Sequence, residues 1–187
     1  MEPTPTLIID KAARIIMNSG LEALTISNLG NEMGVDKNQL KNQLKKDDDI
    51  LLVLLDCFGN EINAIVQEIT NLGIAPETGL QLLFKRLYNL FLLKPYYLTI
   101  IFDKGQLERD DAIKMSIVRI MNIVETYLTT IINAGKKDQT FKTSVTTKLL
   151  VNKILIGFRM FMKDEQLVNE MILELTTLKK QNNDEGY

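Results

Sequence analysis

Apolar residues recur at spacings of three and four along almost the whole chain of 187 residues. This is the period of an amphipathic α-helix, in which residues i, i+3 and i+4 share one face. The sequence holds no convincing stretch of alternating apolar and polar residues, so no strand is predicted. The pattern therefore predicts an all-α fold of about nine helices.

The first fifty residues predict short helices with clear start and stop signals. Thr4 is a good N-cap, and Pro5 follows at the first helical position, where its missing N–H costs nothing. Gly20 ends this first helix. A second helix is predicted to begin at Thr25 and to end at Gly34.

A third helix is predicted to follow Asp36, with Leu40 and Leu44 as its apolar stripe. Together with the second helix it forms a helix-turn-helix pattern. Its other side is polar and basic, as a major groove requires, because amide side chains suit adenine edges and lysines suit guanine edges or phosphates. These polar residues are Lys37, Asn38, Gln39, Lys41, Asn42, Gln43, Lys45 and Lys46.

A polar helix face of this kind also fits a plain solvated helix. Residues 1–50 carry eight acidic and six basic residues, so this part of the chain is net negative. A net negative charge does not favour binding to DNA. From the residues alone, both interpretations stay open.

Longer and more apolar helices are predicted after residue 46. The run Asp47-Asp48-Asp49 suits the positive end of a helix dipole, and we expect a helix from there to about Asn71. The other predicted helices cover 76–93, 95–103, 110–134 closed by Gly135, 144–162 and 166–180. We predict two domains, a three-helix helix-turn-helix domain at 1–48 and a larger helical bundle at 49–187.

A series of landmarks follows in order between Ile8 and Leu55: Ala12-Ala13, Ile15-Ile16, Gly20, Leu24-Thr25-Ile26, Leu29, Met33-Gly34-Val35-Asp36, Leu40, Leu44, and Asp48 before Ile50-Leu51. This order resembles the N-terminal DNA-binding domain of the TetR family of transcriptional regulators. The resemblance covers about a quarter of the chain. The number and length of the later helices are also similar to those of that family.

The resemblance implies that the polar residues of the third helix contact DNA, together with Thr25 and Ser27 at the start of the second helix. Lys41, Lys45 and Lys46 are then assigned to phosphates, and the amide side chains to bases. Thr25 is equally well explained as an N-cap, and Ser27 as a solvated residue.

The chain departs from the family at several of these positions. Where small, aromatic or histidine residues are usual, it has Asn38, Lys41, Gln43 and Leu44. Where a basic residue usually binds a phosphate at the start of the fourth helix, it has Asp47, with Lys45 and Lys46 just before it.

The resemblance also implies that the larger domain binds a small effector. All the aromatic residues lie after residue 50, and several of them gather on neighbouring helices. With adaptable methionines, they predict an apolar pocket in which tyrosine hydroxyls orient the ligand. The alternative is that the same side chains are ordinary core. The predicted pocket residues are Tyr88, Phe91, Tyr96, Tyr97, Phe102, Met121 and Phe158.

The last two predicted helices have wide apolar faces. Two such helices from each subunit are expected to form a four-helix dimer interface. The alternative is that they close the core of the single chain. The predicted interface residues are Leu150, Ile154, Phe161, Leu167, Met171 and Leu175.

The absences narrow the chemistry further. The chain has no histidine and one cysteine, Cys57, which excludes histidine-based catalysis, disulfides within the chain and multi-cysteine zinc sites. We predict no enzyme, no metal, no cofactor and no membrane span, and we expect a cytoplasmic protein. Cys57 is interpreted as a buried inert thiol. Glu108, Asp110 and Asp111 are interpreted as a turn and helix cap rather than a cation site.

These observations predict a TetR-like repressor. It binds double-stranded operator DNA as a homodimer, and a small apolar or amphipathic effector controls the binding. The alternative is a helical interaction or small-molecule-binding protein whose N-terminal domain has lost its affinity for DNA.

Overall fold

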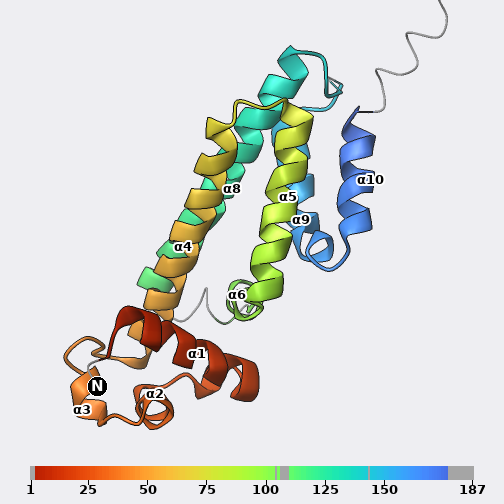
Figure 1. Ribbon diagram of the computed structural model, residues 1–187. Helices are drawn as coiled ribbons and strands as arrows, with labels where there is room; N and C mark the ends of the chain where they lie inside the picture. Colours follow the sequence, from red (N-terminus) through yellow and green to blue (C-terminus); the bar gives the residue numbers. More distant parts are fainter. Residues whose placement is uncertain (1–2, 104, 106–109, 143, 177–187) are drawn as a thin grey trace, which may run out of the picture. The chain divides into compact units, whose positions relative to one another are not determined.

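The computed structural model of the protein describes residues 3–103, 105, 110–142 and 144–176 (Figure 1). Over these residues the regular structure is helical throughout, with no strand. The prediction of an all-α fold is confirmed.

Short helices come first: α1 (Pro5–Ser19), the 3-10 helix η1 (Leu21–Ala23), α2 (Ile26–Met33) and α3 (Lys37–Leu40). The long helices α4 (Asp47–Asn71), α5 (Pro76–Leu93) and α8 (Asp111–Lys137) come after them, together with the short α6 (Tyr96–Ile101), α9 (Thr147–Phe161) and α10 (Glu165–Thr176). The predicted step from short to long helices near residue 50 is therefore confirmed. The part of the last predicted helix beyond residue 176 lies outside the described residues.

The predicted end of α8 at Gly135 is wrong. The helix continues to Lys137. Gly135 serves packing instead, because a Cβ atom at this position would overlap the ring of Phe141, which is buried against it.

The packing divides the chain into two compact units that do not follow the order of the sequence. The first unit comprises Met1–Glu61 and Leu93–Ile120, and the second comprises Ile62–Leu92 and Met121–Tyr187. Both α4 and α8 are continuous helices that contribute their N-terminal parts to the first unit and their C-terminal parts to the second. The functional division at residue 48 stays a prediction.

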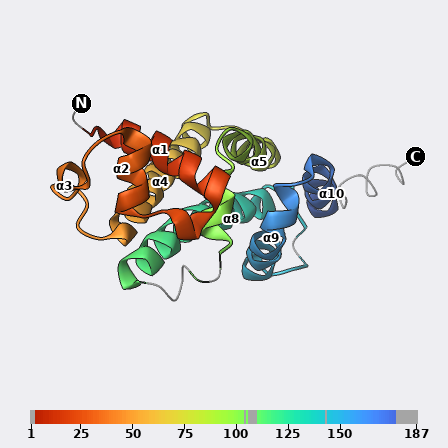
Figure 2. The same cartoon turned by 90° about the horizontal axis from the view of Figure 1, so that it is seen from below.

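In the first unit, α1 packs against α2 (Figure 2) and also against η1 and α6. Its core is made of aliphatic side chains that are almost completely buried: Ile8, Ala12, Leu29, Leu40, Leu44, Ile50 and Leu54. In the second unit, α9 packs against α10, and the core includes Leu80, Leu83, Leu87, Ile132 and Val151. Many of the periodic apolar positions of the sequence are therefore core positions of the two units.

Candidate nucleic-acid interface and effector region

The turn between α2 and α3 is built by its own local residues. Gly34 adopts a left-handed conformation with φ of 67°, which ends α2, and the N–H of Val35 donates to the carbonyl of Gly30 at 3.0 Å. The carboxylate of Asp36 caps α3 by accepting from the N–H of Asn38 at 2.7 Å. These bonds hold α2 and α3 as a helix-turn-helix pair.

Buried leucines fix the orientation of α3. Leu29 on α2 and Leu40 on α3 are both fully buried, and so is Leu44 just beyond the helix. The polar residues between and beside them remain exposed: Lys37, Asn38, Gln39, Lys41, Asn42, Gln43, Lys45 and Lys46. Burial of the leucines therefore presents all eight predicted DNA-contacting residues of this segment to solvent.

The third helix is shorter than predicted. Regular α-helix ends at Leu40, and residues 41–43 form a turn. The N–H groups of Lys45 and Lys46 donate to a carboxylate oxygen of Asp49, at 2.7 and 3.2 Å, rather than continuing the helix. The side chain of Gln43 donates to the carbonyl of Pro3 at 2.9 Å. The expectation of a helix reaching Lys45 is therefore wrong: the N–H groups of Gln43 and Leu44 both donate to the carbonyl of Leu40, so the regular pattern of helical hydrogen bonds ends there.

Three of the basic residues of this segment have ammonium groups without an ion-pair partner in the described residues. Within the described part of the chain, Lys37, Lys41 and Lys45 form no ion pair. Exposed ammonium groups without an acidic partner are the groups that neutralise phosphates when a protein binds DNA. The segment can therefore bind a polyanion even though the unit as a whole carries many acidic residues.

The start of α2 has two caps. Thr25 is half-buried, and its hydroxyl accepts from the N–H of Asn28 at 3.1 Å, so its predicted alternative role as an N-cap is confirmed. The carboxylate of Asp47 accepts from the N–H of Ile26 at 2.7 Å. Ser27 is exposed beside them. Asp47, which stands where a basic residue was expected, therefore ties the start of α4 to the start of α2.

Lys46 differs from the other lysines because it forms an ion pair with Asp110. This hydrogen bond raises the pKa of Lys46 and lowers the pKa of Asp110. Asp110 also accepts from the N–H of Ala112 at 2.7 Å, which confirms its predicted role as a helix cap. The cap has a local signal in the sequence, but the partner 64 positions away has none.

The predicted effector residues are distributed over both units. Tyr96, Tyr97 and Phe102 belong to the first unit, whereas Tyr88, Phe91, Met121 and Phe158 belong to the second. Phe91 and Phe158 meet edge to face, with ring centroids 5.9 Å apart. Met121 is half exposed. The aromatic side chains thus form part of the packing of each unit, and their role as a ligand site stays a prediction.

A polar cluster in the first unit involves two residues that sequence reasoning missed, Glu61 and Lys94. The carboxylate of Glu61 accepts from the ammonium of Lys94 at 2.6 Å and from the hydroxyl of Tyr97 at 3.3 Å. Tyr97 is completely buried and stacks on Phe58 with centroids 4.4 Å apart. Burial raises the pKa of the Tyr97 hydroxyl, which therefore stays protonated. These contacts join α6 to α4 within the unit.

Cys57 takes part in the same cluster. Its thiol lies 3.3 Å from a carboxylate oxygen of Glu61. Burial raises the pKa of the thiol, which disfavours the reactive thiolate. The side chain is half-buried, so the prediction of a fully buried thiol is wrong. Its protonation agrees with an inert role.

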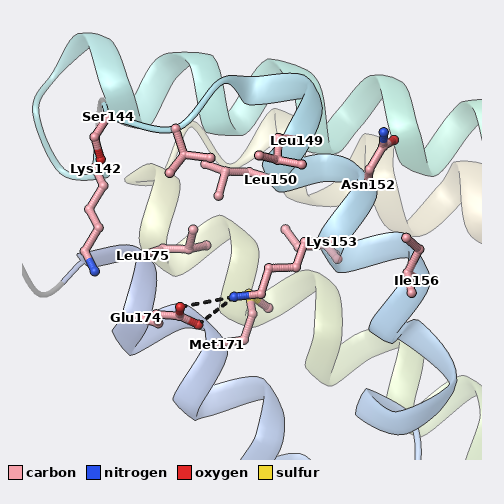
Figure 3. Close-up of a pocket in the computed structure, with 12 residues that line it drawn as sticks. Lys142, Ser144, Leu149, Leu150, Asn152, Lys153, Ile156, Met171, Glu174 and Leu175 are labelled. Carbon is pink, nitrogen blue, oxygen red and sulfur yellow. Dashed lines mark hydrogen bonds and ion pairs between the residues drawn. The ribbon is translucent and has the colours of Figure 1, made fainter.

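An open cavity of about 640 Å³ lies between α9, α10 and the segment just before α9 (Figure 3). An ion pair between Lys153 and Glu174, at 3.0 Å, spans it from one helix to the other. Four of the predicted dimer residues line the cavity and are buried within the chain: Leu150, Ile154, Met171 and Leu175. Phe161 and Leu167 are half-buried.

A second row of apolar residues on α9 is exposed. Leu149, Ile156 and Met160 have exposed fractions of 60%, 85% and 59%. At about 100° per residue these three positions fall on one face, beside the row of Leu150 and Ile154, and Leu149 and Ile156 lie at the rim of the same cavity. Leu173 on α10 is exposed as well, at 60%. We call Leu149, Ile156 and Met160 the α9 stripe.

Among the described residues, one helix passes a length and hydropathy test for a membrane span, and it is α8. Several of its apolar residues are core, including Ile113, Ile117, Leu128 and Ile132. Buried helices of globular proteins pass the same test, so this is weak evidence for a membrane. No group of three potential metal-ligating His, Cys, Asp or Glu residues occurs in the described part of the chain.

No protein-family model matches the chain, and no curated protein matches its sequence. Solved structures do match. The ketosteroid transcriptional regulator KstR2 of Mycobacterium tuberculosis is 16% identical, with a TM-score of 0.77 over 94% of this chain and 96% of that chain. The regulator FadR from Bacillus subtilis, in complex with stearoyl-CoA, is 17% identical, with a TM-score of 0.74 over 94% and 100%.

A third similar structure is the TetR-family transcriptional regulator PfmR from Thermus thermophilus. It is 17% identical, with a TM-score of 0.73 over 90% of this chain and 96% of that chain. The similarity covers both the short N-terminal helices and the longer helices that follow. The chain therefore has the fold of TetR-family regulators, as the sequence predicted.

Proposed function

We propose that this chain, which has the fold of TetR-family regulators, is itself a TetR-like transcriptional regulator. It binds double-stranded operator DNA as a homodimer and represses transcription until a small effector binds. The proposed division of labour is DNA binding by residues 1–48 and effector binding and dimerisation by residues 49–187. The protein acts in the cytoplasm and has no catalytic role.

The observation that carries this proposal is the exposed polar segment of the helix-turn-helix. Lys37, Lys41 and Lys45 have no acidic partner in the described chain, and Asn38 and Asn42 lie exposed among them. Lysines of this kind bind phosphates, and asparagines read base edges in the major groove. We propose a homodimer because it can place two recognition segments about 34–36 Å apart, the spacing of successive major grooves.

The proposed effector is apolar or amphipathic. The protein offers aromatic and aliphatic side chains in its second unit, and the FadR structure holds stearoyl-CoA. Apolar pockets with few polar groups bind ligands of that class. Binding changes DNA affinity by favouring one of two arrangements of the dimer. Because α4 is continuous from the first unit into the second, it is a direct covalent route for that change.

The test is fluorescence anisotropy of the purified protein against duplexes that tile its own upstream region, across a series of salt concentrations. We expect tight binding to one two-fold symmetric tile and a steep dependence on salt. Lys41→Ala should weaken binding to every duplex and reduce the salt slope by about one for each phosphate that is no longer neutralised. Asn38→Ala should relax the preference at a single base pair, at a cost of about 1–3 kcal/mol.

Lys85→Ala is the matched control for Lys41→Ala, because Lys85 is exposed on α5 in the second unit and carries the same charge. We expect it to leave DNA binding unchanged. Equal losses in the two variants would mean that only net charge matters and that α3 is not the recognition segment. Absence of binding to any duplex at low salt, by a folded dimer, would reject the proposal.

One observation favours a second candidate function. The Ile26 N–H at the start of α2 is taken by Asp47, so a carboxylate stands where a DNA phosphate would approach. A protein that has given up DNA binding while keeping the effector site fits this feature. A thermal-shift screen with fatty acids and acyl thioesters distinguishes it, since ligand binding without any DNA binding supports this alternative.

A further inference from the structure

The ion pair between Lys46 and Asp110 joins two parts of the chain that are distant in sequence. Lys46 precedes α4 and Asp110 precedes α8, and both belong to the first unit. The side chain of Lys46 is 54% exposed, whereas that of Asp110 is 20% exposed. The lysine is therefore open to other partners, and the aspartate is the more fixed member of the pair.

Asp110 is held in place by a second contact. One carboxylate oxygen accepts from the N–H of Ala112 at 2.7 Å, and the other pairs with Lys46. The nearby Asp49 is committed to the backbone N–H groups of Lys45 and Lys46, and the Asp48 charge also acts on Lys46. Asp110 is thus the acid that directly engages the Lys46 ammonium.

Lys46 is also one of the three lysines assigned to DNA phosphates. Lys41 and Lys45 have no ion-pair partner in the described residues, whereas the ammonium of Lys46 is already paired with Asp110. An ammonium that pairs with a carboxylate has to leave it, in whole or in part, before it can bind a phosphate. The pair therefore reduces what Lys46 contributes to DNA affinity.

We propose that Asp110 competes with a DNA phosphate for Lys46, so that the start of α8 sets the DNA affinity of the helix-turn-helix. The inference rests on the proposed DNA-binding function. It adds a second route of control beside α4, because α8 is also continuous into the second unit, where Ile131 and Ile132 are core. A change that moves the start of α8 would break or strengthen the ion pair between Asp110 and Lys46.

The experiment measures binding of the full chain to a duplex of about 30 base pairs, long enough for two half-sites one helical turn apart, by fluorescence anisotropy at low salt. Asp110→Asn removes the charge but keeps a good N-cap for α8, so the fold is expected to survive. Asp111→Asn is the matched control, since it removes the same charge one residue later, where the carboxylate makes no ion pair in the described chain. Asp110→Ser is a second capping variant should the asparagine variant fail to fold.

We expect Asp110→Asn to bind about two- to five-fold more tightly than Asp111→Asn, the range for an exposed ion pair. In a Lys46→Gln background the difference between the two variants should disappear. A difference that persists without Lys46 would overturn the proposal, because the effect would then be long-range charge alone.

The outcomes separate this inference from the proposed function. Binding by the wild-type protein that Asp110→Asn does not improve rejects the competition and leaves the proposed function standing. Binding by Asp110→Asn where the wild type binds weakly or not at all supports the competition in its strongest form. No binding by any variant overturns both, because a released Lys46 would then have no phosphate to bind.

Discussion

Asp47 has a structural role at the place where a phosphate-binding residue was expected. Its carboxylate accepts from the N–H of Ile26, beside Thr25, which caps the same helix. A negative charge at this position also interacts favourably with the positive end of the α2 dipole. An acidic residue at this position makes the protein surface less favourable for a DNA phosphate. The same residue stabilises the start of α2 through its hydrogen bond to Ile26.

Replacing Asp47 separates these two effects. Asp47→Ala leaves the Ile26 N–H without its acceptor and should lower the free energy of unfolding by about 1 kcal/mol. Asp47→Asn keeps an acceptor oxygen and should lose less. Urea unfolding followed by circular dichroism measures both. Equal stability of Asp47→Ala and the wild type would show that this cap contributes nothing.

At the same scale, local roles were predictable and distant ones were not. Thr25 and Asp36 cap helices through residues two or three positions away, and the sequence reveals such caps directly. Asp47 meets Ile26 across 21 positions, and Lys46 meets Asp110 across 64. A single sequence contains no signal for such pairs, because they exist only once the helices have packed.

Among the elements, α3 is the clearest departure from the sequence pattern. Leu40 and Leu44 keep their predicted burial, but regular helix ends at Leu40. Apolar spacing alone does not distinguish a helix from a helical turn that still buries the same side chains. After Leu40 the backbone forms a turn, and the N–H groups of Lys45 and Lys46 then donate to Asp49 at the start of α4.

The helix-turn-helix depends on the backbone of Gly34. Its φ of 67° is unfavourable for residues with a side chain, while a Cβ there would meet no atom within 4 Å. Gly34→Ala should therefore cost about 1–2 kcal/mol, all of it conformational. Gly34→Asn is the matched variant and should cost less, because asparagine tolerates this conformation.

Thermal unfolding of the two variants measures this cost, and anisotropy with DNA measures its consequence. DNA binding should fall in the order of wild type, Gly34→Asn and Gly34→Ala, since the turn orients α3. If alanine proved as stable as glycine, the turn would have to adopt another conformation, and the orientation argued for α3 would be wrong.

At the scale of the whole molecule, the dimer surface stays a prediction, and we propose that it includes the α9 stripe. The sequence identifies which positions of α9 are apolar but not which of its apolar faces points inward. Leu150 and Ile154 face the core of the chain, whereas the α9 stripe stays exposed. An exposed apolar row on a helix is the kind of surface that a second copy of the chain covers.

Ile156 is the most exposed member of the α9 stripe, at 85%. In a two-fold dimer the Ile156→Glu substitution enters the interface once from each subunit. At about 2 kcal/mol for each buried side chain, the dissociation constant of the dimer should rise on the order of a thousand-fold. Sedimentation velocity should then show monomer where the wild type is dimeric, with weaker DNA binding as a consequence.

Leu72→Glu is the matched control for Ile156→Glu, because Leu72 is exposed just after α4 and lies outside the α9 stripe. It should leave the dimer intact, since it adds the same charge away from the proposed interface. A monomeric wild type, or a dimer that both variants leave unchanged, would contradict dimerisation through α9. A monomer would lack the two-fold relation between recognition segments on which operator binding depends. A dimer that neither variant disrupts would have to form that relation through another face.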